Sequence, residues 1–472
     1  MKRFLFFLFA GLLAFGCQTQ PAVAQSGRVV PAPESVPAKK ESTAPETSTS
    51  IDTRAAGVLY YEANDYVRNK FTQFNEKKLP YDPKIEAQIR QEQKDLATRH
   101  IATLTKRGVE GADLFFLAML NEVAGHQEVM LETLRAFLST DANADGANPQ
   151  TARRMLVLAA LKNTEQLGDA EALLADYLAH KPQPAEERYR LENLFATAFS
   201  QQGEYASAEA HAHEMLNAAR TASEQAKNGL QRDDFLYSAT NALVEIDLKS
   251  HKEAEAISLL QDLRREALNF PSGNLYRLAT RRLSGIVPPA ELPKLFEQPP
   301  ATDKQPPAIV VSEWIDQKPA QLTDLHGSVV LLDFWAPWCG PCRATFPKLQ
   351  QWHESYKEKG LVILGLTNFF GRVEGRDLAP KAELQYLKEF KQKNRLPYGF
   401  AVSDNNKNDV NYGVLAIPTS FLIDRRGVVR FISIGANADE VAALGRMIKK
   451  LVEEPLPEGT KAADSRSQNW QR

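Results

Sequence analysis

Apolar residues recur at intervals of three and four positions from residue 51 to about residue 286. The pattern is clear in residues 114–120 and resumes at Leu131, Leu134 and Phe137. Such spacing places apolar side chains on one face of an α-helix. Because glycine and proline fall mostly at the ends of these segments, we expect residues 51–286 to form an all-α region of helices joined by short turns.

The helical region carries a weak internal repeat of helix, turn and helix. Three glycines expected in turns, Gly125, Gly168 and Gly203, lie 43 and 35 residues apart, and a similar turn is expected at Ser250 and His251. One unit resembles a tetratricopeptide repeat through Ala196, Phe199, Gly203, Tyr205 and Ala208. The resemblance implies stacked helical hairpins with a concave surface for a peptide or protein. The uneven spacing keeps a non-repetitive helical bundle as the alternative.

The pattern changes after residue 308, where short apolar runs alternate with segments of helical spacing. Strands are predicted at residues 329–334, 361–366, 421–424 and 428–432. The last two runs flank Arg425-Arg426-Gly427, which indicates a hairpin. Helical spacing predicts helices at residues 381–393 and 441–451. Strands mixed with helices indicate an α/β fold for residues 309–453.

Segments without apolar periodicity separate these regions. Prolines are dense between residues 287 and 308, which predicts a linker because proline interrupts both helices and strands. Residues 18–50 are mainly Pro, Ala, Ser, Thr, Glu and Lys, and such a composition predicts a disordered tether. A disordered tail is expected at residues 454–472.

The first residues have the pattern of an export signal. Lys2 and Arg3 precede an apolar stretch of about a dozen residues, which suits a signal-peptide core and is too short to span a bilayer. Residues 13–17 resemble a bacterial lipobox, which implies lipidation of Cys17. Cleavage after Ala24 by an ordinary signal peptidase is the alternative. We therefore expect an exported protein on the periplasmic side of a bacterial membrane, anchored through acyl chains on Cys17.

Composition excludes some classes of protein. The 472 residues are 43% hydrophobic and 25% charged, which is ordinary for soluble globular chains. A formal net charge of −2 gives no general electrostatic reason for binding nucleic acid. Three cysteines in so long a chain exclude a scaffold stapled by disulfides.

The candidate chemistry lies where the apolar run at residues 329–334 leads into Cys339-Gly340-Pro341-Cys342 and then into helical spacing. A cysteine between a strand and a helix N-terminus faces unpaired N–H groups and the positive end of the helix dipole. Both lower the pKa of Cys339 and make it the expected nucleophile. Cys342, one helical turn later, can attack a mixed disulfide on Cys339 and release the partner. Pro341 fits a first helical turn, and Gly340 leaves room for another chain.

Residues 333–342 resemble the active-site segment of thioredoxins, and residues 412–424 resemble the segment that carries the cis-proline loop of that family. The resemblance implies that Pro418 follows a cis peptide bond and that Asp333 is a buried acid that relays a proton for the second thiol. It also implies that substrate binds against Trp338, Gly340, Pro341, Ile417 and Pro418. No cofactor beyond the redox-active Cys339–Cys342 disulfide is expected.

A helix expected between the strand at residues 361–366 and the proline loop makes the C-terminal region similar to TlpA/ResA-like exported proteins. The similarity implies a thiol-disulfide oxidoreductase with protein disulfides as substrates and a membrane redox protein that restores the dithiol. Gly340, Pro341 and Ile417 favour a reductase. Two departures stand out, since that group often carries asparagine at the position of Asp333 and a glutamate where Phe369 and Phe370 stand here.

Other interpretations of the two cysteines remain. A zinc site requires four ligands, and the third cysteine, Cys17, lies in the targeting segment. A purely structural disulfide is a further alternative. A thiol peroxidase on the same fold would place a threonine three residues before its cysteine, a pattern that Cys339 lacks. A last alternative makes the helical region a scaffold and the thioredoxin-like region a binding domain.

Overall fold

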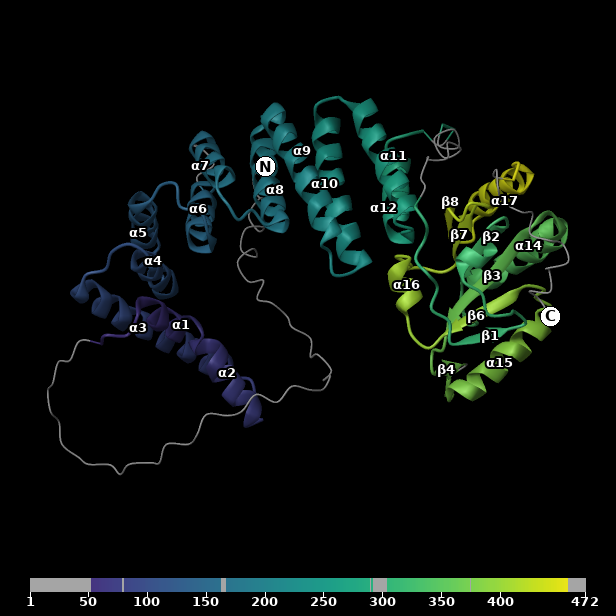
Figure 1. The fold of residues 1–472 in the computed structure, drawn as a ribbon, viewed down its shortest axis with the longest axis horizontal. Coiled ribbons are helices and arrows are strands. Elements are labelled where there is room, and N and C mark those ends of the chain that lie inside the picture. The colour runs from purple at the N-terminus through teal and green to yellow at the C-terminus, as the bar shows by residue number, and fades with distance from the viewer. Residues whose placement is uncertain are drawn as a thin grey trace, which may run out of the picture. The chain divides into compact units, whose positions relative to one another are not determined.

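The computed structural model describes residues 52–78, 80–162, 167–288, 290–291, 304–373 and 375–456 (Figure 1). The described residues from Thr53 onward belong to one compact unit. The predicted signal peptide, Cys17 and the tether lie outside the described residues, as does most of the predicted tail. Among the helices that are described, none has the length and apolar character needed to cross a membrane.

Helices alone make up the first part of the described chain, which confirms the predicted all-α region. They are α1 (Ala56–Asn64), α2 (Tyr66–Glu76), α3 (Pro83–Arg107), α4 (Asp113–Ala124), α5 (Gln127–Thr140), α6 (Ala147–Ala160), α7 (Leu167–Ala179), α8 (Ala185–Gln202), α9 (Tyr205–Glu224), α10 (Gly229–Lys249), α11 (Glu253–Asn269) and α12 (Gly273–Ser284). Consecutive helices pack as pairs, among them α4 with α5, α6 with α7 and α8 with α9. The pairs can be followed in Figure 1.

Three of the four predicted turns are present. Gly125 ends α4 and Gly203 ends α8 in left-handed conformations, with φ of 88° and 80°, where glycine is favoured. A third turn follows α10 at Ser250 and His251. The turn expected at Gly168 was wrong, because Gly168 is the second residue of α7. The first N–H groups of a helix have no intrahelical partner, so a glycine there disturbs the helix little and does not mark a turn.

A six-stranded sheet forms the C-terminal region, with the strand order β1-β6-β3-β2-β7-β8. Its strands are β1 (Glu313–Ile315), β2 (Val329–Phe334), β3 (Leu361–Asn368), β6 (Gly399–Ser403), β7 (Thr419–Ile423) and β8 (Val429–Ile434). The two-stranded ribbon consists of β4 (Arg372–Val373) and β5 (Arg376–Asp377). The helical elements are η2 (Leu322–Leu325), α14 (Gly340–Tyr356), η3 (Lys357–Lys359), α15 (Pro380–Lys393), α16 (Lys407–Asn411) and α17 (Ala438–Glu453).

The sheet confirms the predicted α/β fold. Strand β2 runs parallel to β3 and antiparallel to β7, and β7 and β8 form the predicted hairpin. Every residue of β2 is buried, because this central strand is covered on both faces. The helix expected between the second strand and the proline loop is present as α15.

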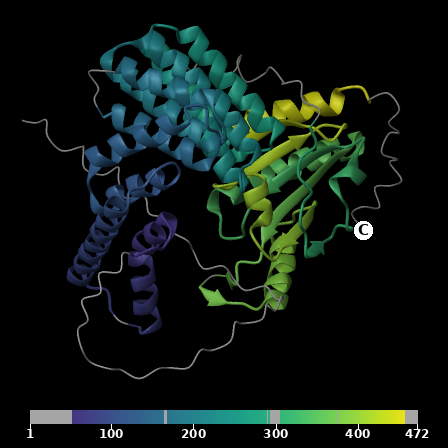
Figure 2. The ribbon, with the colours of Figure 1, turned by 60° about the vertical axis from the view of Figure 1, so that its left-hand side comes forward.

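Two hydrophobic cores lie on the two faces of the sheet. One contains Leu331 and Trp335 with residues of α14, α15 and α17. The other contains Leu332 and Phe334 with residues of α10, α11 and α12. Contacts of α11 and α12 with β8 belong to this second core, and Figure 2 shows the helices beside the yellow strands. The last helices of the all-α region therefore cover one face of the sheet.

Candidate active site

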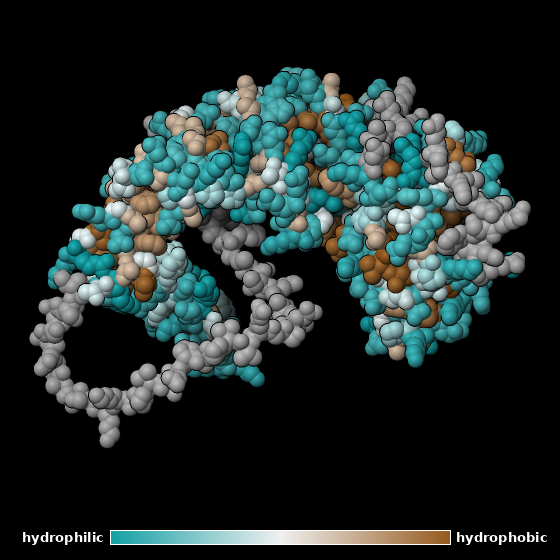
Figure 3. Space-filling model, in the orientation of Figure 1, coloured by the Kyte–Doolittle hydropathy of each residue, from teal (hydrophilic) through white to brown (hydrophobic). Residues whose placement is uncertain are grey.

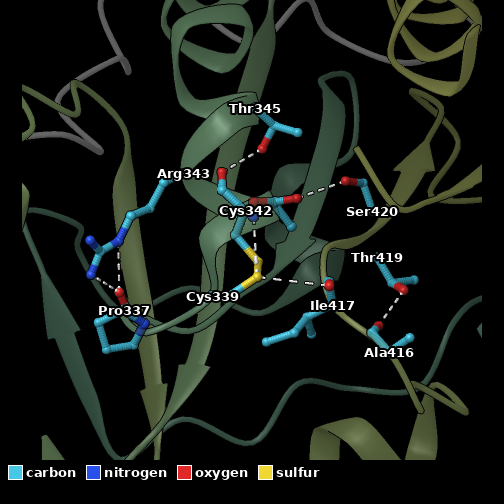
Figure 4. Close-up of a disulfide and its surroundings, with 10 residues drawn as sticks. Pro337, Cys339, Cys342, Arg343, Thr345, Ala416, Ile417, Thr419 and Ser420 are labelled. Carbon is cyan, nitrogen blue, oxygen red and sulfur yellow. Dashed lines mark hydrogen bonds between the residues drawn. A yellow bond between two sulfur atoms is a disulfide. The ribbon is translucent and has the colours of Figure 1, made fainter. Parts of the chain in front are cut away.

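The two cysteines lie at the junction between β2 and α14, as the sequence predicted. Cys339 is the N-cap residue of α14, and its Sγ accepts a hydrogen bond of 3.1 Å from the N–H of Cys342 (Figure 4). Gly340 and Pro341 occupy the first helical positions and are exposed. An N–H group directed at sulfur, together with the helix dipole, favours a thiolate on Cys339 over a thiol.

Cys339 and Cys342 form a disulfide with an S–S distance of 2.04 Å, so the structure represents the oxidised protein. Cys339 is 4% exposed and Cys342 is 0% exposed. Cys339 is thus the less buried of the two cysteines. Arg343, which follows the pair, donates from Nε to the carbonyl of Pro337 over 2.9 Å and holds the turn before Cys339.

The peptide bond between Ile417 and Pro418 is cis, which confirms the expectation for this loop. The carbonyl oxygen of Ile417 lies 3.8 Å from Cys339 Sγ, where the reduced thiol can donate to it. Thr419 Oγ1 donates to the carbonyl of Ala416 over 2.7 Å, and the N–H of Gly435 donates to the carbonyl of Pro418 over 2.8 Å. Hydrogen bonds to the carbonyls of Ala416 and Pro418 thus hold the loop around the cis peptide bond.

Asp333 is 1% exposed on β2. Side chains alternate along a strand, so Asp333 shares a face with Leu331 and Trp335, which belong to the core that also contains Cys342. The hydroxyl of Ser420, its register partner on β7, donates to Asp333 Oδ1 over 2.7 Å. Burial raises the pKa of Asp333 to about 7, and the Ser420 hydrogen bond opposes that rise. A carboxyl group in this state can take up or release a proton near neutral pH.

A groove of about 320 Å³ opens beside the disulfide. Its lining includes Trp338, Phe370, Leu415 and Ile417. Trp338 and Leu415 are 60% and 59% exposed, and the rings of Trp338 and Phe370 meet edge to face with centroids 5.6 Å apart. Figure 3 shows apolar residues gathered next to α16, where part of this lining lies. An apolar surface beside a reactive sulfur can hold an extended peptide with apolar side chains.

Of the residues predicted to bind substrate, Trp338 and Ile417 line the groove, and Pro418 directly follows Ile417. Gly340 and Pro341 lie exposed at the start of α14 instead of in the groove lining. Cys17, the predicted lipidation site, lies outside the described residues. The described part of the chain contains no group of three or more His, Cys, Asp or Glu side chains arranged to hold a metal ion.

Sequence reasoning missed Ser420 and Glu383. Glu383 on α15 is 0% exposed, and its carboxylate accepts from the N–H groups of Phe370 and Gly371 at 2.8 Å and 3.0 Å. It therefore fixes the loop that carries Phe370 into the groove. A signal was available, since Glu383 falls on the same helical stripe as the apolar Leu387 and Phe390.

Comparisons with known proteins match the C-terminal part of the chain. The profile of the AhpC/TSA family matches residues 303–432. Thiol-disulfide oxidoreductase ResA of Bacillus thuringiensis (strain Al Hakam) is 34% identical over 137 residues, covering 29% of this chain and 72% of that protein. The protein DipZ of Mycobacterium tuberculosis (strain CDC 1551 / Oshkosh) is 31% identical over 153 residues, covering 31% of this chain and 20% of DipZ. A crystal structure of a thioredoxin-family thiol:disulfide interchange protein from Chlorobium tepidum TLS is 22% identical, covers 32% of this chain and 99% of that chain, and gives a TM-score of 0.26.

Proposed function

Because the chain belongs to the family of ResA-like thiol-disulfide oxidoreductases, we propose that its Cys339–Cys342 pair reduces disulfides of exported proteins. The observation that carries the proposal is the position of Cys339. Its sulfur accepts the N–H of Cys342 at the N-terminus of α14 and lies 3.8 Å from the carbonyl of the cis-proline loop. A reactive sulfur beside the cis-proline loop and an apolar groove suits an extended peptide substrate.

The reaction proceeds in two exchanges. In the first, the Cys339 thiolate attacks one sulfur of the substrate disulfide, a mixed disulfide forms, and the other substrate sulfur leaves as a thiolate and takes up a proton. In the second, Asp333 accepts the proton of the Cys342 thiol, and the Cys342 sulfur attacks Cys339 Sγ. The Cys339–Cys342 bond forms, the second substrate sulfur leaves, and two electrons have passed to the substrate.

A substitution series tests this mechanism. Cys339→Ser is expected to abolish reduction of insulin disulfides, because the attacking sulfur is lost. Cys342→Ser is expected to accumulate mixed disulfides on Cys339, because no resolving thiol remains. Cys17→Ser is the matched control and should retain insulin reduction. Full activity of Cys339→Ser, or peroxide consumption by the reduced protein in place of insulin reduction, would overturn the proposal.

The direction of electron flow follows from the reduction potential. Gly340 and Pro341 between the cysteines, with Ile417 before the cis-proline, favour a reductase. We expect a potential near the roughly −270 mV of thioredoxin, measured by equilibration with glutathione or dithiothreitol. A value near the roughly −120 mV of strong oxidants would assign the opposite direction. As a reductase the protein needs a membrane thiol-disulfide protein that returns two electrons to the pair.

Export and anchoring belong to the same proposal. The basic and apolar start of the chain, followed by Cys17, supports export to the periplasmic side of a bacterial membrane and lipidation of that cysteine. Labelled palmitate should be incorporated into the wild-type protein and not into Cys17→Ser, and only the wild type should remain with the membrane fraction. Equal labelling of both would exclude Cys17 as the anchor.

We assign partner recognition to the helical region. Paired helices such as α8 with α9 support this role, because stacked helical hairpins expose long surfaces suited to a protein or peptide. Mixed disulfides trapped by the full-length Cys342→Ser protein in cells identify the substrates. Trapped partners that bind the Cys339→Ser protein equally well, without a covalent bond, would locate recognition outside the sulfur chemistry.

A further inference from the structure

Helix α12 begins directly against the backbone that leads into the cis-proline loop. The N–H of Gly273 donates to the carbonyl of Tyr412 over 2.9 Å, and the N–H of Asn274 donates to the carbonyl of Gly413 over 2.7 Å. These are the first two N–H groups of α12, which have no partner within the helix. Backbone carbonyls of the C-terminal α/β region, which we call the redox region, therefore satisfy the first N–H groups of α12.

Two buried side chains surround this junction. Ser272, the N-cap residue of α12, is 0% exposed, and its Oγ accepts from the N–H of Leu275 and donates to Asp233 Oδ2. Asp233 on α10 is also 0% exposed, and its other oxygen accepts from Arg232 Nη2 over 2.8 Å. A buried carboxylate is costly unless it is bonded in this way, so its partners have defined positions.

Two glycines allow the close approach of the backbones. Gly413 has a φ of 55°, and a Cβ there would lie 2.5 Å from Ser272 Oγ and 3.2 Å from Asp233 Oδ2. A Cβ on Gly273 would lie 3.2 Å from Thr419 Cγ2 and 3.4 Å from the carbonyl oxygen of Gly413. The first turn of α12 thus bonds residue 413 through the N–H of Asn274 and lies close to Thr419, so it reaches the two ends of the segment that contains the cis-proline. We call residues 413–419 the cis-proline segment.

The middle of the cis-proline segment lies at the groove and beside Cys339. Leu415 and Ile417 line the groove, and the carbonyl oxygen of Ile417 lies 3.8 Å from Cys339 Sγ. None of these groups touches Ser272 or Asp233 in the contacts described, so any influence must pass through the ends of the segment. An error of about 1 Å in such a loop is enough to change a rate strongly.

We propose that Ser272 and Asp233, together with the glycine backbone at residue 273, are positioning residues of the redox site. They hold the Gly413 end of the cis-proline segment and lie close to its Thr419 end, and so set where the middle of the segment meets a protein substrate. The proposal rests on the proposed function in taking a protein disulfide as the substrate. It makes the end of the helical region a support for the substrate site.

Two variants of the full chain test the proposal. Ser272→Ala removes the hydroxyl that joins α12 to Asp233, and Gly273→Ala adds a methyl group against Thr419. Each is expected to raise KM for insulin about tenfold, because substrate meets a displaced loop, with kcat changed less. Alkylation of reduced Cys339 by iodoacetamide should stay within about twofold of the wild-type rate, because the start of α14 is untouched.

Matched controls separate positioning from general damage. Ser284→Ala removes an exposed hydroxyl at the other end of α12, and Gly168→Ala adds a methyl group in α7, where no side chain of the described residues in other elements lies within 4 Å of the added Cβ. Both should leave KM unchanged. An unchanged KM in folded Ser272→Ala and Gly273→Ala would overturn the proposal. A fall in the alkylation rate as large as the rise in KM would also overturn it. If Ser272→Ala does not fold, Asp233→Asn takes its place with the same expected KM.

Hydrogen exchange provides a readout that does not depend on catalysis. Amides of residues 413–417 and 419 should exchange about tenfold faster in Ser272→Ala and Gly273→Ala than in the wild type, and not in the controls. Unchanged exchange would overturn the positioning role even if KM rises. Absence of insulin reduction by the wild type would instead overturn the proposed function, and exchange would still decide whether α12 holds the segment.

Discussion

At the scale of single residues, Asp333 and Ser420 show how the environment changes a side chain. Asp333 stands in a strand whose other residues are apolar, and burial is the cause that raises its pKa to about 7. The Ser420 hydroxyl opposes the rise because its hydrogen bond favours the ionised carboxylate. The carboxyl group is thereby kept in the range where it can exchange protons during the thiol reaction.

The raised pKa of Asp333 has a consequence for stability. An unfolded aspartate ionises near pH 4, whereas the folded one keeps its proton to about pH 7, so stability falls as the pH rises between these values. Asp333→Asn is therefore expected to stabilise the oxidised protein at pH 8 by up to about 4 kcal/mol and to have little effect at pH 4. Urea unfolding at both values measures the difference.

Asp404→Asn, at an exposed position, should change stability little at either pH. An equal gain from Asp333→Asn at pH 4 and pH 8 would mean that packing, and not ionisation, causes the effect.

The sequence indicated the position of Asp333 and the cis bond before Pro418 through resemblance to thioredoxins. It gave no indication of Ser420 as the partner of Asp333, because that contact depends on the antiparallel register of β2 and β7 across many intervening residues. The apolar pattern of a strand indicates which of its faces is buried, but β2 and β7 are not joined by a tight turn that would fix which of their residues pair.

At the scale of elements, α15 fixes one wall of the groove. The buried carboxylate of Glu383 accepts hydrogen bonds from the N–H groups of Phe370 and Gly371. Residues 369–371 themselves contain no carboxylate. Strands and helices of the redox region were predictable because each has its own apolar pattern. Gly168 was misplaced because glycine is tolerated both in turns and in a first helical turn.

Glu383→Gln tests this wall. An amide has one acceptor oxygen where the carboxylate has two, so one of the two loop N–H groups loses its partner. The free energy of unfolding should fall by about 1–3 kcal/mol, and KM for insulin should rise several-fold, as judged by urea unfolding and steady-state kinetics. Glu389→Gln, exposed on the same helix, is the control and should change neither. A drop in stability without a change in KM would separate Phe370 from substrate binding.

At the scale of the whole molecule, the predicted linker at residues 287–308 does not separate two independent cores. Residues of α10, α11 and α12 share a core with β2, β3, β7 and β8. The end of the linker already contacts the redox region, since Tyr412 Oη donates to the carbonyl of Pro307 over 2.6 Å. A proline-rich composition indicates where helices and strands stop, and it carries no information on which surfaces meet afterwards.

Removal of residues 1–303 should expose the apolar face that the helices cover. We expect the remaining fragment to bind the dye ANS and to lose at least about 2 kcal/mol of stability, which is the burial of one large apolar side chain. Removal of residues 1–52, which lie outside the compact unit, is the control and should have neither effect. A fragment that excludes the dye and matches the stability of the longer chain would show that the shared core is dispensable.

The complete burial of Cys342 limits how this protein can exchange electrons with its partners. We therefore expect only one atom, the sulfur of Cys339, to exchange with either the molecule that delivers electrons or the molecule that receives them. Donor and acceptor must therefore visit in turn, the donor at the disulfide form and the acceptor at the dithiol form. Steady-state rates should accordingly follow a ping-pong pattern, with parallel reciprocal plots when both are varied.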